Sequence, residues 1–226
     1  MYSRMMSRPA GGVGISILAG VLFLIVGVPG ADAQVDDPVV INEVLADPAS
    51  DWDGDGTVDF KGDEWIEILN NSAEPINLSD YYLRDGLGED PHLRLSGVVD
   101  PGQTAVFYGS EAVAWQTEMG MSTTGFSLNN GGDLVQLVRA FMGPDGADWE
   151  LMFAVSYEDH EAEDDRSCGF NAELSDWLLF DAINPYGGDL DPVGSGCAPS
   201  PGEPNTCQDL VAVENNSFGQ VKLIFR

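Results

Sequence analysis

A short run of aspartates and glycines in the first third of the chain has the spacing of a calcium-binding loop. The run is Asp51-Trp52-Asp53-Gly54-Asp55-Gly56-Thr57-Val58-Asp59. Calcium takes about six to eight oxygen ligands, and its loops place carboxylates at positions one, three, five and nine, glycine at six and a backbone carbonyl at seven. The residues that would ligate the ion are, in order, Asp51, Asp53, Asp55, Thr57 and Asp59. We therefore predict that this loop binds Ca²⁺.

The loop departs from the helix–loop–helix pattern at its twelfth position, where a bidentate Glu is expected. Gly62 stands there, and Asp63 and Glu64 follow it. We expect Asp63 and Glu64 to supply the missing carboxylate if the loop stretches into the strand that follows. The alternative interpretation is a solvated acidic turn without a metal. Magnesium fits the pattern less well, because it requires near-octahedral geometry and gives up its water reluctantly.

A second acidic run lacks this alternation of carboxylates and glycines: Glu158-Asp159-His160-Glu161-Ala162-Glu163-Asp164-Asp165. It is predicted to be a solvated hairpin tip, with a loose second cation site as the alternative. His160 could be a transition-metal ligand or a general base, but a lone histidine among carboxylates is expected to be charged and solvated. His92 has no Ser or Cys in a nucleophile motif, and neither G-x-S-x-G nor H-E-x-x-H occurs. No catalytic residues are therefore predicted.

The composition indicates a folded protein with a strongly acidic surface. The chain has 226 residues, of which 38 are acidic and 9 basic, with 43% hydrophobic residues and a net charge of −29. This apolar content is enough to bury a core, so the charge is expected on the surface. Such a surface repels phosphate, which argues against nucleic-acid partners and against docking on anionic lipid. Divalent cations on the acidic clusters would relieve the repulsion.

Residues 1–33 have the organisation of a secretory signal peptide. Two arginines precede an apolar stretch from Val13 to Val28, and Ala31-Asp32-Ala33 forms a small-x-small cleavage site. The stretch is short for a bilayer core, which needs about 20 residues, so a retained membrane anchor is the less favoured alternative. Cleavage would leave 7 basic and 37 acidic residues, a net charge of −30. We expect the product to be secreted, or located at the cell surface or in the periplasm.

The three cysteines all lie in the last third of the chain, at Cys168, Cys197 and Cys207. Export permits a disulfide, and three cysteines allow one bridge in any of three pairings. We predict that a bridge includes Cys197, because either partner would then anchor the Gly/Pro-rich segment that precedes it. Three unpaired thiols are the alternative. The spacing gives no indication of a zinc or redox motif.

From Pro38 onward, hydrophobic periodicity predicts strands rather than helices. The expected strands cover residues 39–46, 63–70, 74–78, 81–85, 93–97, 104–109, 133–140, 150–158, 166–170 and 177–181, and residues 126–128 lead into a turn at residues 129–132. Only a weak helical turn is expected, around residues 111–119. Side chains alternate along a strand, so Trp65 should lie on the face opposite to Ile66 and Ile68. About eight to ten short strands predict an all-β, immunoglobulin-like β-sandwich.

Five pieces of the sequence resemble the lamin tail domain of exported bacterial proteins. They are the N-E-V after the first hydrophobic pair, D-E-W-I-E-I-x-N, L-S-D-x-x-L-x-D, G-G-D-x-V and a closing SPGEPN. They occur in the family's order over about residues 38–206. The resemblance implies an immunoglobulin-like sandwich that serves as a binding or scaffolding module without catalytic residues. The chain departs from the family pattern between Phe180 and Ser200, and in its cysteines.

Three parts are therefore expected: a signal peptide (1–33), a lamin-tail-like sandwich (34–206) and a C-terminal tail (207–226). The tail loosely resembles sorting tails of exported bacterial proteins, with an edge strand or a frayed terminus as alternatives. We expect a non-catalytic binding or scaffolding module with structural Ca²⁺ and an extracellular protein or polysaccharide as partner. The alternative function is an extracellular metal-dependent hydrolase, a nuclease or glycosidase. A catalytic metal would keep an open coordination position beside a cleft.

Overall fold

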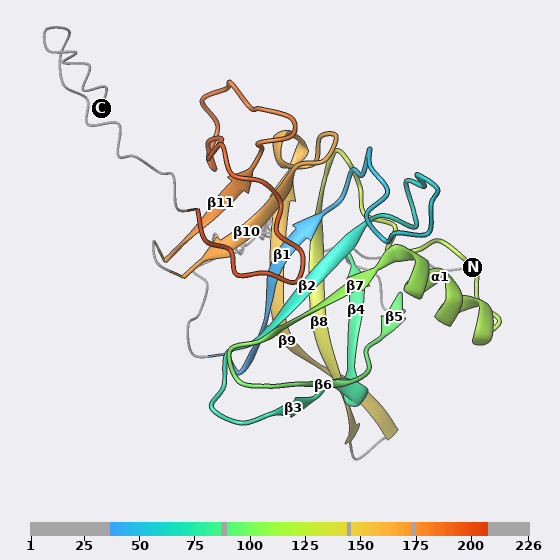
Figure 1. Cartoon of the computed structure of the whole chain (residues 1–226). Helices are drawn as coiled ribbons and strands as arrows, with labels where there is room; N and C mark the ends of the chain where they lie inside the picture. Colours follow the sequence, from blue (N-terminus) through green and yellow to red (C-terminus); the bar gives the residue numbers. More distant parts are fainter. Residues whose placement is uncertain (1–36, 87–89, 144–145, 173–174, 208–226) are drawn as a thin grey trace, which may run out of the picture. The chain divides into compact units, whose positions relative to one another are not determined.

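The computed structural model describes residues 37–86, 90–143, 146–172 and 175–207 (Figure 1). The predicted signal peptide lies outside the described residues, as does the predicted tail after Cys207. No helix among the described residues has the length and apolarity needed to cross a membrane.

The described residues are mostly β-strand. The strands are β1 (Val39–Leu45), β2 (Trp65–Asn70), β3 (Ile76–Asn77), β4 (Tyr81–Asp85), β5 (Leu93–Arg94), β6 (Val98–Val99), β7 (Thr104–Tyr108), β8 (Gly132–Gly143), β9 (Gly146–Glu158), β10 (Ser167–Asn171) and β11 (Asp176–Phe180). The helical elements are η1 (Leu78–Asp80), α1 (Gly109–Glu118) and η2 (Asp159–Glu161).

These strands form two main antiparallel sheets that pack around one core (Figure 1). One sheet has the order β11-β10-β1-β2-β7 and the other the order β5-β4-β8-β9, while β3 and β6 make a small separate pair. Buried side chains of both sheets belong to a single hydrophobic cluster that includes Ile41, Ile68, Leu83, Leu137 and Val155. The prediction of an all-β, immunoglobulin-like sandwich is confirmed.

Strand β2 lies between β1 and β7 in the five-stranded sheet and is buried on both faces. Ile66 and Ile68 point into the hydrophobic cluster, and Ile68 pairs with Ile41 of β1. Trp65 and Glu67 alternate with them and are also fully buried. Trp65 packs against Trp52, with 6.0 Å between their ring centroids. The predicted alternation is therefore present, although the second face of the strand is covered by loops.

The prediction of only a weak helical turn around residues 111–119 was wrong, because α1 is a ten-residue helix. Its buried face includes Ala112 and Gln116, one turn apart. The Gln116 amide is satisfied by the carbonyls of His92 and Gly125 and by the backbone N–H of Thr124. A polar residue on the buried face hides the apolar stripe by which helices are recognised. Residues 126–128, which precede the turn expected at residues 129–132, form a turn and a loop.

The start of α1 packs tightly on the end of the acidic loop. The backbone N–H of Gly109 donates to the Glu64 carbonyl at 2.7 Å, and that of Ser110 donates to the Gly62 carbonyl at 3.0 Å. A Cβ at position 109 would overlap the carbonyl oxygen of Lys61. Only glycine fits there, so the acidic loop and the helix are held in direct backbone contact.

The disulfide joins Cys197 to Cys207, and Cys168 is buried and unbridged. The prediction that the bridge includes Cys197 is confirmed. The bridge closes a segment that folds back onto β1 and β2, whose buried glutamates bind it. Glu43 accepts hydrogen bonds from the backbone and the hydroxyl of Ser200, and Glu67 accepts one from the backbone N–H of Gly202 at 2.6 Å.

The N-E-V and W-I-E pieces of the sequence thus hold the closing SPGEPN in place. Asn205 reinforces the contact by donating to the Asn42 carbonyl at 3.0 Å. Burial raises the pKa of Glu43 to about 7, against the lowering effect of hydrogen bonds from Ser167 and Ser200 and with a further rise from the charge of Glu67. These glutamates act as structural anchors for the C-terminal segment.

Removing the disulfide is expected to loosen this closing segment. The double variant Cys197→Ser/Cys207→Ser lacks the cross-link that closes a loop of about ten residues. Its free energy of unfolding should therefore be lower by roughly 3 kcal/mol. Denaturant unfolding of the oxidised wild type and the variant measures this loss. Peptide mapping of unreduced protein provides the control, and a Cys168–Cys207 bridge would contradict the pairing.

Candidate functional site

Three carboxylates of the predicted calcium loop come together between β1 and β2. Asp51, Asp53 and Asp63 each offer one oxygen, and these oxygens lie within 4.8 Å of one another. Asp51 is exposed, Asp53 is half-buried and Asp63 is buried, so the group extends from the surface to the base of the loop. Hard carboxylate oxygens are the donors that calcium prefers, and the chemistry of the group fits that ion.

The buried Asp63 organises the loop around itself. One of its oxygens accepts the backbone N–H groups of Trp52 at 2.6 Å and Asp53 at 3.0 Å, and the other accepts that of Asp59 at 2.7 Å. A carboxylate oxygen has two acceptor sites, so the oxygen that binds Asp59 can still accept another partner. Asp63, which follows Gly62 at position twelve, therefore holds the two ends of the loop together.

Short-range hydrogen bonds give the rest of the loop its turn. Asp51 accepts the backbone N–H groups of Gly54 and Gly56, both at 2.9 Å. Gly54 and Gly56 have φ angles of 76° and 90°, a region that other residues rarely adopt. The glycine at position six thus has the conformational role that the sequence pattern requires.

Other residues predicted to ligate the ion lie outside the group of three. Asp55 accepts the N–H of Thr57 at 2.7 Å. Asp59 accepts the backbone N–H groups of Gly62 and Lys61, and these hydrogen bonds lower its pKa. Thr57, whose backbone carbonyl is the predicted ligand at position seven, is exposed.

Glu64 faces a different part of the molecule. It is buried and lines a cavity of about 460 Å³ that Phe60, Thr124 and Leu128 also line. Burial raises its pKa to about 9, against the lowering effect of backbone N–H groups of residues 126–128. The structure thus places Asp63, but not Glu64, with Asp51 and Asp53.

One residue that positions the loop was not found from the sequence. Asp165 accepts hydrogen bonds from the backbone of Ala49 and from the backbone and hydroxyl of Ser50. It also accepts the indole N–H of Trp52 at 2.7 Å. Asp165 is more than a hundred residues from the loop in sequence, and nothing in its local pattern indicates this contact.

The prediction that residues 158–165 form a solvated tip was wrong for half of the segment. His160, Glu161, Ala162 and Asp165 are buried, while Glu158, Asp159, Glu163 and Asp164 are exposed. Arg166 explains part of the burial, because its guanidinium donates to the His160 carbonyl at 3.0 Å and to the Asn184 carbonyl at 2.7 Å. The expected charged and solvated histidine is instead 6% exposed.

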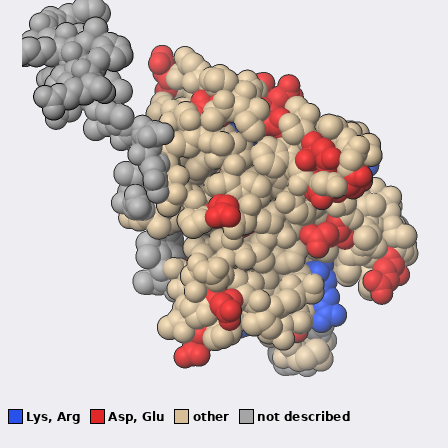
Figure 2. Space-filling view, in the orientation of Figure 1, with Lys and Arg blue, Asp and Glu red and all other residues tan. Residues whose placement is uncertain are grey.

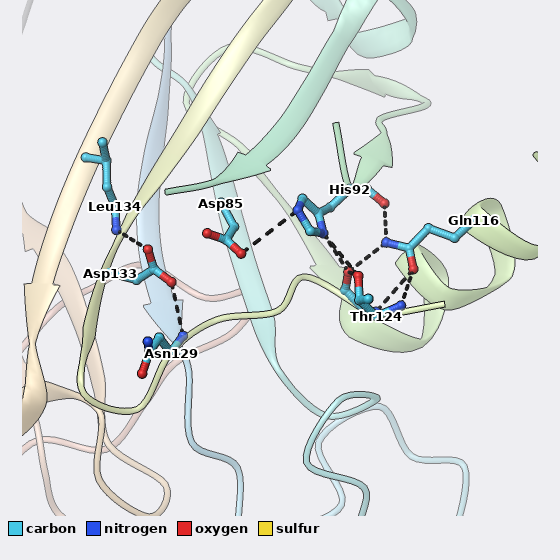
Figure 3. Close-up of polar contacts among 8 residues, drawn as sticks. Asp85, His92, Gln116, Thr124, Asn129, Asp133 and Leu134 are labelled. Carbon is cyan, nitrogen blue, oxygen red and sulfur yellow. Dashed lines mark hydrogen bonds and ion pairs between the residues drawn. The ribbon is translucent and has the colours of Figure 1, made fainter. Parts of the chain in front are cut away.

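His92 belongs to a polar network that joins β5 to α1 and the loop after it (Figure 3). Its Nδ1 lies 3.1 Å from the Gly125 carbonyl and 3.4 Å from the Thr124 hydroxyl, and its Nε2 lies 3.9 Å from Asp85. A carbonyl can only accept, so Nδ1 carries the hydrogen of this bond. In that tautomer Nδ1 cannot take a proton from Thr124, and the arrangement does not activate that hydroxyl as a nucleophile.

Charge on the face shown in Figure 2 is mainly acidic, with basic side chains confined to a few small areas. The basic residues among the described positions are Lys61, Arg84, Arg94, Arg139 and Arg166. This distribution provides no continuous basic path on the visible face for a phosphate backbone.

A family model for the lamin tail domain matches residues 33–158. The chain belongs to the lamin tail domain family. No curated protein matches it. The lamin tail domain is a non-enzymatic, immunoglobulin-like binding or structural module, and the matched residues include the acidic loop and β1 to β9. The closing SPGEPN lies beyond the matched range, although the structure binds it to family motif residues of β1 and β2.

Proposed function

We propose that this lamin tail domain is an exported, non-catalytic binding or scaffolding module in which the loop of residues 51–63 binds structural Ca²⁺. The observation that carries the proposal is the approach of the carboxylates of Asp51, Asp53 and Asp63 to within 4.8 Å of one another. Three like charges at this separation repel each other, and a divalent cation between them turns the repulsion into attraction.

The ion would act by fixing a loop at one end of the sandwich. The loop packs on α1 through Gly62 and on the segment after β9 through Asp165. It also exposes two apolar side chains, Val58 and Phe60, which are 56% and 69% exposed. A loop held by calcium would present these side chains in a constant arrangement to an extracellular protein or polysaccharide.

Export is supported by the signal-peptide pattern of residues 1–33 and by the Cys197–Cys207 bridge, since disulfides persist in oxidising compartments. After cleavage the chain would carry a net charge of −30. We therefore place it outside the cytoplasm, without membrane insertion and without nucleic-acid partners. A hydrolase would need a positioned base beside an open metal, and both the family and the hydrogen bond made by His92 Nδ1 favour the non-catalytic module.

Calcium is expected to stabilise the protein after treatment with a chelator. Extracellular sites bind with Kd of about 10⁻⁴ to 10⁻³ M. At a free concentration near ten times Kd, mass action adds roughly 1.4 kcal/mol to the free energy of unfolding. For a domain of this size the melting temperature should rise by about 3–6 °C. Differential scanning calorimetry with calcium and with magnesium measures the effect.

The double variant Asp53→Asn/Asp55→Asn should lose most of this shift. Its matched control is Asp80→Asn/Asp100→Asn, which removes the same charge at two exposed positions outside the loop. The control separates site binding from general relief of repulsion. Equal stabilisation by calcium and magnesium, with the same response in both double variants, would show that the loop is only a solvated acidic turn.

A further inference from the structure

The side chain of His160 is buried in a way that its hydrogen bonding does not explain. It is 6% exposed, and both of its ring nitrogens are buried without a hydrogen-bond partner among the described residues. An imidazole always carries at least one N–H, and its neutral form also carries a lone pair. A buried polar group of this kind requires an explanation, and a bound ion is one of the known ones.

The ring is held in place by an aromatic contact. Tyr186, from the segment after β11, lies against it with 4.9 Å between ring centroids. The Arg166 guanidinium lies over the Tyr186 ring, 5.4 Å from the ring centroid. It also donates a hydrogen bond to the His160 carbonyl. The imidazole is therefore positioned by packing and by a backbone contact, independently of its nitrogens.

Two carboxylates lie near one of the ring nitrogens. One ligand atom each from Glu158, Asp159 and His160 lies within 4.8 Å of the others. Glu158 and Asp159 are exposed, so an ion could enter from solvent on their side and meet the buried imidazole. We propose that Glu158, Asp159 and His160 form a site for a divalent transition metal, with Zn²⁺ as the representative ion, distinct from the calcium loop.

The donor set decides the class of metal. Calcium takes oxygen ligands, whereas imidazole nitrogen suits zinc and other transition metals. Zinc binds nitrogen and carboxylate oxygen at about 2.0–2.2 Å, so the three ligand atoms would move closer together around it, with water completing the coordination. The metal would take one ring nitrogen, and the other would carry the proton.

The surrounding charge favours a cation. The run of residues 158–165 contains six carboxylates, and Arg166 is the basic residue next to it. A bound ion would join the turn after β9 to the Tyr186 segment through the imidazole. That segment lies between β11 and the disulfide and is rich in glycine and proline, so it gains most from such an anchor.

The test is titration of untagged, chelator-treated protein with Zn²⁺ by isothermal calorimetry, and with Co²⁺ by visible absorption of its coordinated form. His160→Phe keeps a ring against Tyr186 and removes both nitrogens, and it should weaken zinc binding at least tenfold. Asp159→Asn changes only an exposed side chain, and it should also weaken zinc binding about tenfold. The matched control, Glu163→Gln, removes one exposed charge from the same run and should change the affinity less than twofold.

Three results would overturn the site. In the first, His160→Phe and Asp159→Asn bind zinc with the same affinity as Glu163→Gln. In the second, the wild type binds zinc no more strongly than it binds calcium. The third is no zinc binding by the wild type while His160→Phe melts higher, which would mean that the nitrogens are simply unpaired. Asp53→Asn/Asp55→Asn should keep zinc binding, and His160→Phe should keep the calcium shift, so each proposal can fail without the other.

Discussion

Ile68→Asp is expected to unfold the domain. Ile68 is fully buried in β2, pairs with Ile41 of β1 and belongs to the cluster that both sheets share. The variant would either bury an unpaired carboxylate or expose the core, at a cost of several kcal/mol. This is a large part of the about 5–15 kcal/mol by which domains are stable. Circular dichroism melting and one-dimensional NMR of the purified variant measure the loss.

The matched control is Val98→Asp, which puts the same charge on a strand residue that is 64% exposed. It should melt close to the wild type, because its side chain stays in water. Ile68→Val removes only one methylene and should cost about 1 kcal/mol. Cooperative melting of Ile68→Asp near the wild-type temperature would show that the position of Ile68 in β2 is wrong.

The sandwich was predictable because most of its strands carry their own signal. Segments such as those of β1, β2 and β8 are rich in β-branched or alternating apolar residues and are bounded by turn residues. The full helix α1 was not predicted, because Gln116, a polar residue, occupies its buried face and is satisfied by distant backbone groups. Burial of a hydrogen-bonded polar residue cannot be inferred from local periodicity.

The candidate site was predictable only where its geometry is local. The spacing of Asp51 and Asp53 and the glycine at position six are short-range features, and the structure places these carboxylates with Asp63. The contacts of Asp165 with the loop depend on how β1 and β10 pair, which brings residues over a hundred positions apart together. The burial of His160 likewise depends on Tyr186, a tertiary contact without a sequence signal.

The environment of Glu64 makes stability depend on pH. Burial, with a smaller contribution from the charge of Asp85, raises its pKa to about 9 in the folded protein, from 4.5 in the unfolded chain. One of its oxygens is buried without a hydrogen-bond partner among the described residues. Between these two pKa values the folded protein keeps the proton and the unfolded chain loses it. The contribution of Glu64 to the free energy of unfolding is therefore complete below about pH 4.5 and is lost as pH rises towards 9.

Glu64→Gln is expected to remove this dependence and to stabilise the protein at alkaline pH. The amide resembles the protonated carboxyl, so the variant and the wild type should unfold similarly near pH 4.5, whereas at pH 9 the variant should be more stable by on the order of 5 kcal/mol. Urea unfolding at intervals between pH 4.5 and 9 measures how the free energy of unfolding of each protein changes with pH.

The matched control is Glu74→Gln, which removes the same charge from an exposed residue. It should keep the wild-type dependence on pH, which separates the effect of Glu64 from the general repulsion of an acidic chain. Parallel pH profiles for all three proteins would mean that Glu64 ionises normally and that its carboxylate is stabilised by the backbone N–H groups of residues 126–128.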